Sequence, residues 1–114
     1  MSESNINSES CTVEFHKNGN IRSKRFFLEG KLHNLNGPAL ISYYENGNIE
    51  TEHYCLEGKL HNLNGPAVKQ YREDGSIERE LYFTEGELYN PNGSDVTVYK
   101  DNIVIPTRVE TYTY

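Results

Sequence analysis

Tryptophan is missing from this chain, and hydrophobic residues of all kinds make up only 35% of its 114 positions. The short supply of leucine, isoleucine, valine and phenylalanine excludes a thick interior and predicts one thin domain. No apolar run approaches the roughly 20 residues that a membrane-spanning helix requires. Tyrosine is the exception, with nine copies. A tyrosine-based core suits a half-exposed sheet, because each buried hydroxyl needs a hydrogen-bond partner.

Cysteine is also scarce, since Cys11 and Cys55 are the two present. Two cysteines are too few for a disulfide-stapled secreted domain, and we interpret both as apolar fillers of repeated positions. The first ten residues, MSESNINSES, lack the basic start and the apolar stretch of a secretory signal. We therefore predict a disordered polar tail over residues 1–10 and a cytoplasmic location.

An internal repeat of 28 residues organises the remainder of the chain. The eleven residues EGKLHNLNGPA, from Glu29 to Ala39, return unchanged from Glu57 to Ala67. The same offset relates three families of glycines: Gly19, Gly47 and Gly75; Gly30, Gly58 and Gly86; Gly37, Gly65 and Gly93. We divide the β-repeat domain, residues 11–114, into units 11–38, 39–66 and 67–94 and a degenerate cap over 95–114, which closes the last open edge.

Each unit predicts two strands and a tight turn. Asn18-Gly19, Asn46-Gly47 and Asp74-Gly75 are typical of two-residue hairpin turns, in which both central residues have positive φ. No window of useful length shows a 3.6-residue apolar period. The predicted fold is therefore all-β, with repeated antiparallel β-hairpins forming a single elongated, twisted meander sheet.

Apolar residues recur in the polar connections between units. One slot holds Leu32, Leu60 and Leu88, and another holds Leu35, Leu63 and Pro91. We expect these side chains to fold back over one face of the sheet and to form its core.

Stacked units place equivalent side chains in columns across a sheet. One predicted aromatic column contains Phe15, Tyr43, Tyr71 and Tyr99, and a second contains Phe26, Tyr54 and Tyr82. A third, aliphatic column contains Ile21, Ile49, Ile77 and Ile105. The columns are either core and half-core or a strip that binds a ligand, so Tyr43, Tyr71, Tyr54 and Tyr82 are candidate binding residues.

The string Tyr54-x-x-x-Gly58, followed by Gly65-Pro-Ala-x-x-x-Tyr71-x-x-x-Gly75, resembles the MORN repeat, especially its longer bacterial and viral variants. The resemblance covers about Cys11 to Gly93. It implies a curved run of β-hairpins used as an interaction surface, and relatives with this pattern include proteins classed as bacterial antitoxins or immunity partners.

Residues for catalysis are not apparent. Carboxylates recur with the repeat, whereas a catalytic pair should occur once. His33 and His61 occupy one repeated slot, and their shared neighbours are Asn and Leu, which do not complete a metal site. We therefore predict no enzyme activity, no catalytic residues, no metal and no cofactor.

Negative charge is concentrated in the middle units, where residues 45–87 hold ten Asp or Glu against four Lys or Arg. Four of these carboxylates, Glu50, Glu52, Glu78 and Glu80, alternate with other residues and are expected to share one sheet face. They form either a solvated face or an acidic docking strip for a basic protein surface. The same sign of charge disfavours direct nucleic-acid binding. Membrane binding is disfavoured because only the first unit offers a basic patch.

The leading hypothesis is a protein-binding repeat module whose acidic, tyrosine-rich strip inhibits a basic, nucleic-acid-cleaving enzyme. Antitoxins, immunity proteins and viral counter-defence factors are proteins of this type. The alternative is a structural or membrane-apposing scaffold of the MORN-repeat kind. The sequence leaves the oligomeric state open.

Overall fold

The computed structural model describes residues 8–91, 93–100 and 103–107, the last five by their backbone alone. Every regular element in these ranges is a β-strand. The longer strands are β1 (Glu9–Phe15), β2 (Ile21–Leu28), β4 (Leu40–Tyr43), β5 (Ile49–His53), β8 (Val68–Tyr71), β9 (Ile77–Leu81), β12 (Val96–Lys100) and β13 (Ile103–Thr107). The shorter strands are β3 (Lys31–Leu32), β6 (Cys55–Leu56), β7 (Lys59–Leu60), β10 (Phe83–Thr84) and β11 (Glu87–Leu88).

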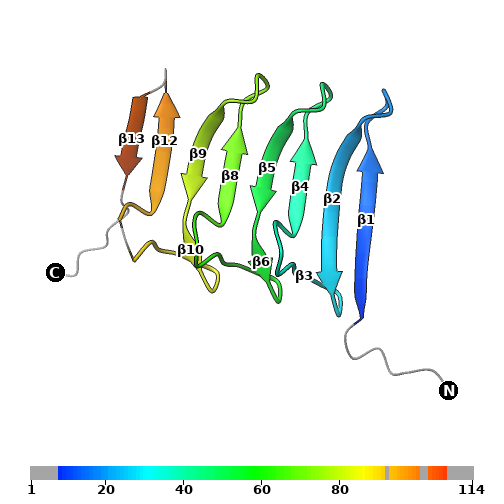
Figure 1. Cartoon of the computed structure of the whole chain (residues 1–114), viewed down its shortest axis with the longest axis horizontal. Coiled ribbons are helices and arrows are strands. Elements are labelled where there is room, and N and C mark those ends of the chain that lie inside the picture. The colour runs from blue at the N-terminus through cyan, green and yellow to red at the C-terminus, as the bar shows by residue number, and fades with distance from the viewer. Residues whose placement is uncertain (1–7, 92, 101–102, 108–114) are drawn as a thin grey trace.

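The eight longer strands form one open antiparallel sheet in the order β1-β2-β4-β5-β8-β9-β12-β13. Successive strands are neighbours throughout, apart from the short ones, so the sheet is a meander built from hairpins (Figure 1). This arrangement confirms the predicted all-β fold of antiparallel hairpins. Within the described residues, the two edges of the sheet are β1 and β13.

The turns at the upper end of the sheet in Figure 1 differ from the prediction. Gly47 has φ 94°, whereas Asn46 does not have positive φ. The Gly47 N–H donates to the Tyr44 carbonyl, and the Tyr44 N–H donates to the Asn48 carbonyl. This geometry is a turn followed by one left-handed residue, the three-residue hairpin loop rather than the two-residue one. The prediction was wrong because both loop types favour Asn-Gly, and only the strand register separates them.

The two-residue turns lie instead at Glu29-Gly30, Glu57-Gly58 and Glu85-Gly86, where both residues have positive φ. Leu28 and Lys31 pair directly across the first of these turns. The connections between units are therefore partly folded as small lower hairpins, β2–β3, β6–β7 and β10–β11. These hairpins were not predicted from the sequence, because Glu rarely adopts positive φ.

The chain ends depart from the predicted boundaries in two places. Strand β1 begins at Glu9, so the last two residues of the predicted tail belong to the sheet, while residues 1–7 lie outside the described residues. At the other end, Ile105 pairs with Val98, whereas Ile21, Ile49 and Ile77 pair with the aromatic residue of their units. The fourth member of the aliphatic column is thus out of register.

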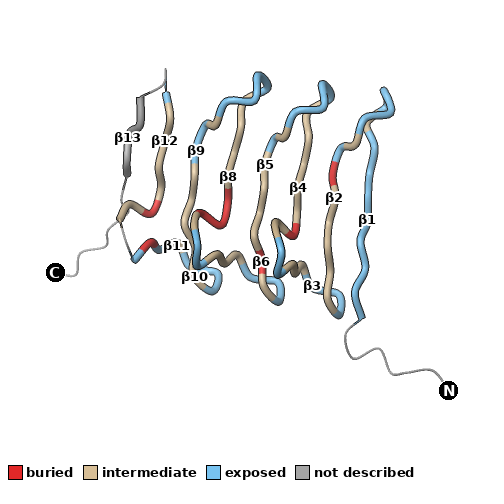
Figure 2. The backbone as a smooth tube through the Cα atoms, in the orientation of Figure 1, coloured by how far each residue is buried: buried red, intermediate tan, exposed pale blue. Residues whose placement is uncertain are grey.

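The interior is thin, because no second layer of the described residues covers the sheet. Among the described residues, Ala39, Cys55, Ala67 and Val68 are buried, and none of the large side chains is completely buried. Figure 2 shows that the buried stretches of the backbone are short. Leu32, Leu60 and Leu88 are half-buried, as a thin core requires. Leu35 and Leu63, however, are 77% and 79% exposed, and Pro91 is exposed too. The expectation that this second slot forms core was wrong, because the connecting loops hold its side chains away from the sheet.

Candidate functional site

The sheet has two chemically different faces. Cross-strand partners lie on the same face, and successive residues of a strand lie on opposite faces. The register joins Ser23, Ser42, Thr51, Gln70 and Arg79 in one row, which defines the serine face. The adjacent row joins Lys24, Ile41, Glu52, Lys69 and Glu80 on the opposite side. We call that side the tyrosine face, because Tyr43, Tyr71 and Tyr99 lie there by the same alternation.

A β-bulge divides the predicted acidic strip between the two faces. Ser42 pairs with Thr51 and Tyr43 with Ile49, so Glu50 is the extra residue of a bulge, and Glu78 is its equivalent in the next unit. The Ser42 hydroxyl donates to the Glu50 carboxylate over 3.3 Å, which places this carboxylate on the serine face. Desolvation and then the charges of Glu50 and Glu78 raise the pKa of Tyr44, a residue of that same face.

Glu52 and Glu80 lie on the other side of the sheet. Each accepts a hydrogen bond from a tyrosine hydroxyl of the following unit, Tyr71 at 2.7 Å and Tyr99 at 2.6 Å. The prediction that all four glutamates share one face was therefore wrong. The bulge adds one residue to the second strand and so breaks the two-residue alternation between Glu50 and Glu52.

The candidate tyrosines Tyr43, Tyr71, Tyr54 and Tyr82 are all half-buried, so none belongs to a deep core. Burial and the hydrogen bond to Glu52 raise the pKa of Tyr71. For Tyr99, the hydrogen bond to Glu80 is the largest cause, ahead of burial, and the pKa of Tyr99 rises to about 12. These hydroxyls stay protonated and serve as fixed donors, which holds the aromatic rings of the tyrosine face in place.

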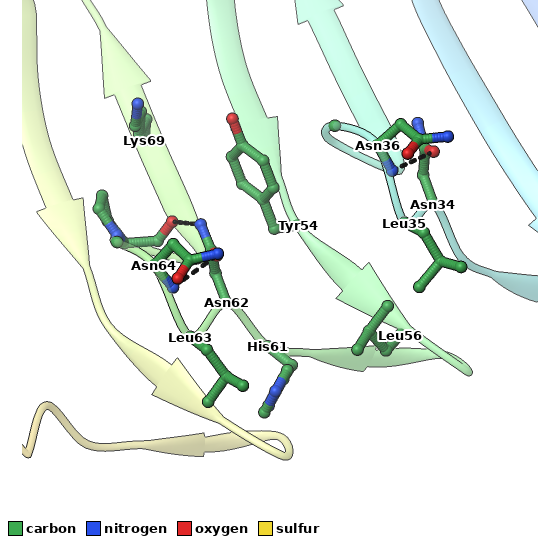
Figure 3. Close-up of a pocket in the computed structure, with 13 residues that line it drawn as sticks. Asn34, Leu35, Asn36, Tyr54, Leu56, His61, Asn62, Leu63, Asn64 and Lys69 are labelled. Carbon is green, nitrogen blue, oxygen red and sulfur yellow. Dashed lines mark hydrogen bonds between the residues drawn. The ribbon is translucent and has the colours of Figure 1, made fainter.

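Among the described residues, three grooves lie on the tyrosine face beside the connecting loops. Their floors are Phe26, Tyr54 and Tyr82, the second predicted aromatic column, and their volumes are about 300, 520 and 360 Å³. The central groove lies between two loops that carry Leu35 and Leu63, with Tyr54 between them and Lys69 on the neighbouring strand β8 (Figure 3). The 28-residue repeat therefore produces a row of similar grooves over Phe26, Tyr54 and Tyr82, which we call the groove row.

Side-chain hydrogen bonds shape the loops of the groove row. Asn34 Oδ1 accepts from the Asn36 N–H at 3.0 Å, and the Asn34 amide donates to the Pro38 carbonyl at 3.1 Å. Asn62 makes the same two bonds one unit later, to Asn64 and Pro66. Asn side chains commonly hold turns in this way. Leu35 lies inside the first such turn, and for that reason its side chain projects into solvent.

The neighbouring lower hairpins are bonded to one another. His33 Nδ1 accepts from the Glu57 N–H at 2.9 Å, and His61 Nδ1 accepts from the Glu85 N–H at the same distance. The Gly58 N–H also donates to the Leu32 carbonyl at 2.8 Å. The repeated histidines thus act as acceptors between units, and they position the loops that border the grooves.

Exposed large hydrophobic residues mark the groove row more clearly than charge does. Leu35, Leu63 and Tyr89 all line its grooves, and Tyr89 is 50% exposed. The sequence contained a signal for this surface, since the leucine of Asn-Leu-Asn recurs in a loop without a strand period. Contiguous exposed apolar groups in a monomer commonly mark an interaction site.

The described residues offer little for bond-making chemistry. Within them, no group of three His, Cys, Asp or Glu side chains could hold a metal ion. Cys11 is a free exposed thiol, and burial raises the pKa of the free Cys55 thiol, which lowers its reactivity. Over the same ranges, no helix is long and apolar enough to cross a membrane.

No protein-family model matches the chain, and neither a curated protein nor a solved structure does so.

Proposed function

We propose that this chain is a protein-binding repeat module that engages its partner through the groove row. One observation carries the proposal: Leu35 and Leu63, at equivalent positions of consecutive units, are 77% and 79% exposed beside grooves with tyrosine floors. Keeping leucines in solvent gains nothing for folding, whereas a partner that covers them gains their apolar area. Aromatic floors with projecting aliphatic side chains are typical of the energetic centres of interfaces.

The grooves suit a polypeptide better than a small ligand. They are open and in series, and asparagine side chains and loop backbone form much of their lining. Small-molecule sites enclose most of their ligand and are lined largely by apolar side chains. A partner that spans two units would meet the same groove twice, so that weak local contacts add along one surface.

The partner that best fits the charge is a basic protein. The chain has a formal net charge of −6, and this charge accelerates association with a basic surface. The most specific form of the proposal is inhibition of a basic, nucleic-acid-cleaving enzyme, by an antitoxin, an immunity protein or a viral counter-defence factor. The resemblance to longer MORN-type repeats supports this form.

Matched double variants test the proposal. The full chain is immobilised in three forms, which are the wild type, Leu35→Asp/Leu63→Asp and Glu50→Lys/Glu78→Lys. The proteins that each form captures are identified by mass spectrometry. Because the two variants alter opposite faces, the leucine variant should lose the partner at least tenfold in affinity. The serine-face variant should retain the partner and change mainly its association rate. If the captured partner cleaves nucleic acid, the wild type should inhibit the cleavage and the leucine variant should not.

Two results would contradict the proposal. Loss of binding in the serine-face variant alone would move the binding surface to the opposite face. Retention by anionic vesicles in the absence of any protein partner would favour the membrane-apposing scaffold instead. Circular dichroism of each variant shows that a loss of binding does not reflect unfolding.

A further inference from the structure

The remaining exposed large hydrophobics lie on the edge strand β1. Val13 is 41% exposed and Phe15 is 60% exposed, and every residue of β1 is exposed. The equivalent strands β4 and β8 are half-buried or buried at each position. Strand β1 therefore has the composition of an internal strand without the neighbour that an internal strand has.

Hydrogen bonds show which backbone groups of β1 are free for pairing. Cys11 is opposite Phe26, whose N–H donates to the Ala39 carbonyl on the far side of β2. Antiparallel partners either bond each other or both point away, so the N–H and carbonyl of Cys11 point away from β2. Alternation gives the same direction to Glu9, Val13 and Phe15. The Glu29 N–H, which donates to the Ser8 carbonyl, confirms the opposite direction for the even-numbered residues.

The array itself shows how such an edge is normally filled. The carbonyls of Ala39, Ala67 and Asp95 occupy the repeat position of Cys11. Each accepts a hydrogen bond of 2.7 or 2.8 Å from the preceding unit, from Phe26, Tyr54 and Tyr82 respectively. Cys11 belongs to the first unit, which has no preceding unit among the described residues. The free edge of β1 is thus an inter-unit interface without its second half.

The opposite edge of the sheet cannot supply that half. Val98 pairs with Ile105, and Thr97 pairs with Pro106 in β13. By the alternation seen in the internal units, the N–H and carbonyl of Thr97 bond toward β9. The backbone of its partner Pro106 therefore faces the outer edge of the sheet. Proline has no N–H, and at an edge it blocks the addition of another strand. A head-to-tail array of copies through β13 and β1 is therefore disfavoured.

We propose that β1 pairs with β1 of a second copy of this chain, forming a closed two-fold dimer with one continuous sheet. In the register centred on Thr12, Cys11 meets Val13 of the other copy and Glu9 meets Phe15. All the outward N–H and carbonyl groups of both strands are then bonded, and no two glutamates are opposite each other. The same register places the apolar Cys11, Val13 and Phe15 of both copies on one face, so the two groove rows also share a face.

Sedimentation over a series of concentrations tests the dimer. The wild type should approach twice the chain mass of 13.1 kDa. Val13→Pro removes an N–H that points outward, so it should give a monomer with an unchanged β-sheet spectrum. Val13→Ala truncates the side chain, keeps the N–H, and should retain at least partial dimerisation. A wild type that stays monomeric at every concentration overturns the proposal, as does a folded Val13→Pro variant that still dimerises.

A cross-link tests the register, and it decides the matter if Val13→Pro fails to fold. Thr12 would face Thr12 of the second copy as a non-hydrogen-bonded pair, with Cα atoms about 4.5 Å apart, which permits a disulfide. In a Cys11→Ser background, Thr12→Cys should therefore oxidise rapidly to a covalent dimer. Ser10→Cys, on the same face but distant from its copy, should not. Equal cross-linking at both positions, or none at Thr12→Cys, overturns this pairing.

Discussion

At the scale of single residues, different side chains perform the same task in successive units. His16 Nε2 donates to the Tyr43 carbonyl at 2.8 Å, and the Tyr44 hydroxyl donates to the Tyr71 carbonyl at 2.6 Å. Arg72, in the same repeat position, donates to the Tyr99 carbonyl. What the units preserve is a donor of sufficient length, which is why this position does not stand out as a repeat in the sequence.

Substitutions at two glycines distinguish a requirement for backbone conformation from a requirement for space. Gly47 has φ 94° and nothing within 4 Å of the Cβ that a substitution would add, whereas Gly37 lacks positive φ and would place its Cβ 3.8 Å from Asn34. Gly47→Ala should therefore lower the free energy of unfolding by about 1–2 kcal/mol, the cost of the left-handed conformation. Gly37→Ala should be neutral or should stabilise by less than about 1 kcal/mol. Denaturant titration of both variants measures the difference, and equal losses would contradict the turn geometry.

The Tyr99–Glu80 pair makes a prediction about alkaline pH. The hydrogen bond to Glu80 raises the pKa of Tyr99 from 10.0 to about 12. The neutral phenol is thus favoured by the folded state, and its contribution to stability is complete below pH 10 and lost as the pH rises through about 12. Glu80→Gln should move the Tyr99 ionisation back toward 10. NMR of the tyrosine Cζ atoms resolves this step, and Glu78→Gln, on the opposite face, should leave it unchanged.

At the scale of elements, the lower hairpins are too small to be stable alone. Each contains two-residue strands or the end of β2, and an isolated hairpin is marginal in water even when longer. Hydrogen bonds from one hairpin to the next supply the stability that each hairpin lacks alone. The loops of the groove row are consequently positioned by their neighbours rather than by their own sequences.

Substitutions of His33 test this docking. The hydrogen bond from the Glu57 N–H requires an acceptor at the position of Nδ1, which the Oδ1 of an asparagine can also occupy. His33→Asn should therefore retain most of the stability, whereas His33→Ala should lose about 1 kcal/mol because it removes the hydrogen bond between the two hairpins. Chemical denaturation measures both. If both variants lose the same free energy of unfolding, the His33 ring contributes by packing rather than by accepting this hydrogen bond.

At the scale of the whole molecule, the sheet is a one-dimensional array. Each hairpin contacts its neighbours along the sheet, and the upper turns are joined in the same way, since Asn18 and Asn20 both donate to the Glu45 carbonyl. Asn46 and Asn48 repeat these bonds to Glu73 one unit later. Stability in such arrays is approximately a sum of unit and interface contributions.

Deletion of residues 39–66 tests this additivity. Pro38 would then precede Ala67 just as Pro66 does in the intact chain, and His16 would face the carbonyl of Tyr71 instead of Tyr43. The shortened chain should keep its β-sheet spectrum and unfold cooperatively, with a lower free energy of unfolding because one interface is lost. Loss of structure would show that the units depend on contacts beyond their nearest neighbours.

The sequence alone determined the architecture, because the repeat and its glycines are local properties of the chain. A 28-residue period, turn residues in each half-unit and no helical period specify stacked hairpins whatever their partners. The second aromatic column, with Tyr54 and Tyr82, was also predictable, since equivalent positions of stacked units have equivalent surroundings. The lower hairpins were not, because their turns depend on glutamates with positive φ that bonds between units hold in place.

Only the tertiary structure decided which residues face one another and which face solvent. One bulge residue in each second strand places Glu50 and Glu52 on opposite faces, and the pattern of residue types does not predict this bulge. The exposure of Leu35 and Leu63 depends on how Asn34 and Asn62 hold their loops away from the sheet. The hydrophobic pattern indicates how much free energy a chain would gain by burying a residue. Whether a surface exists to cover that residue is a property of the assembled sheet.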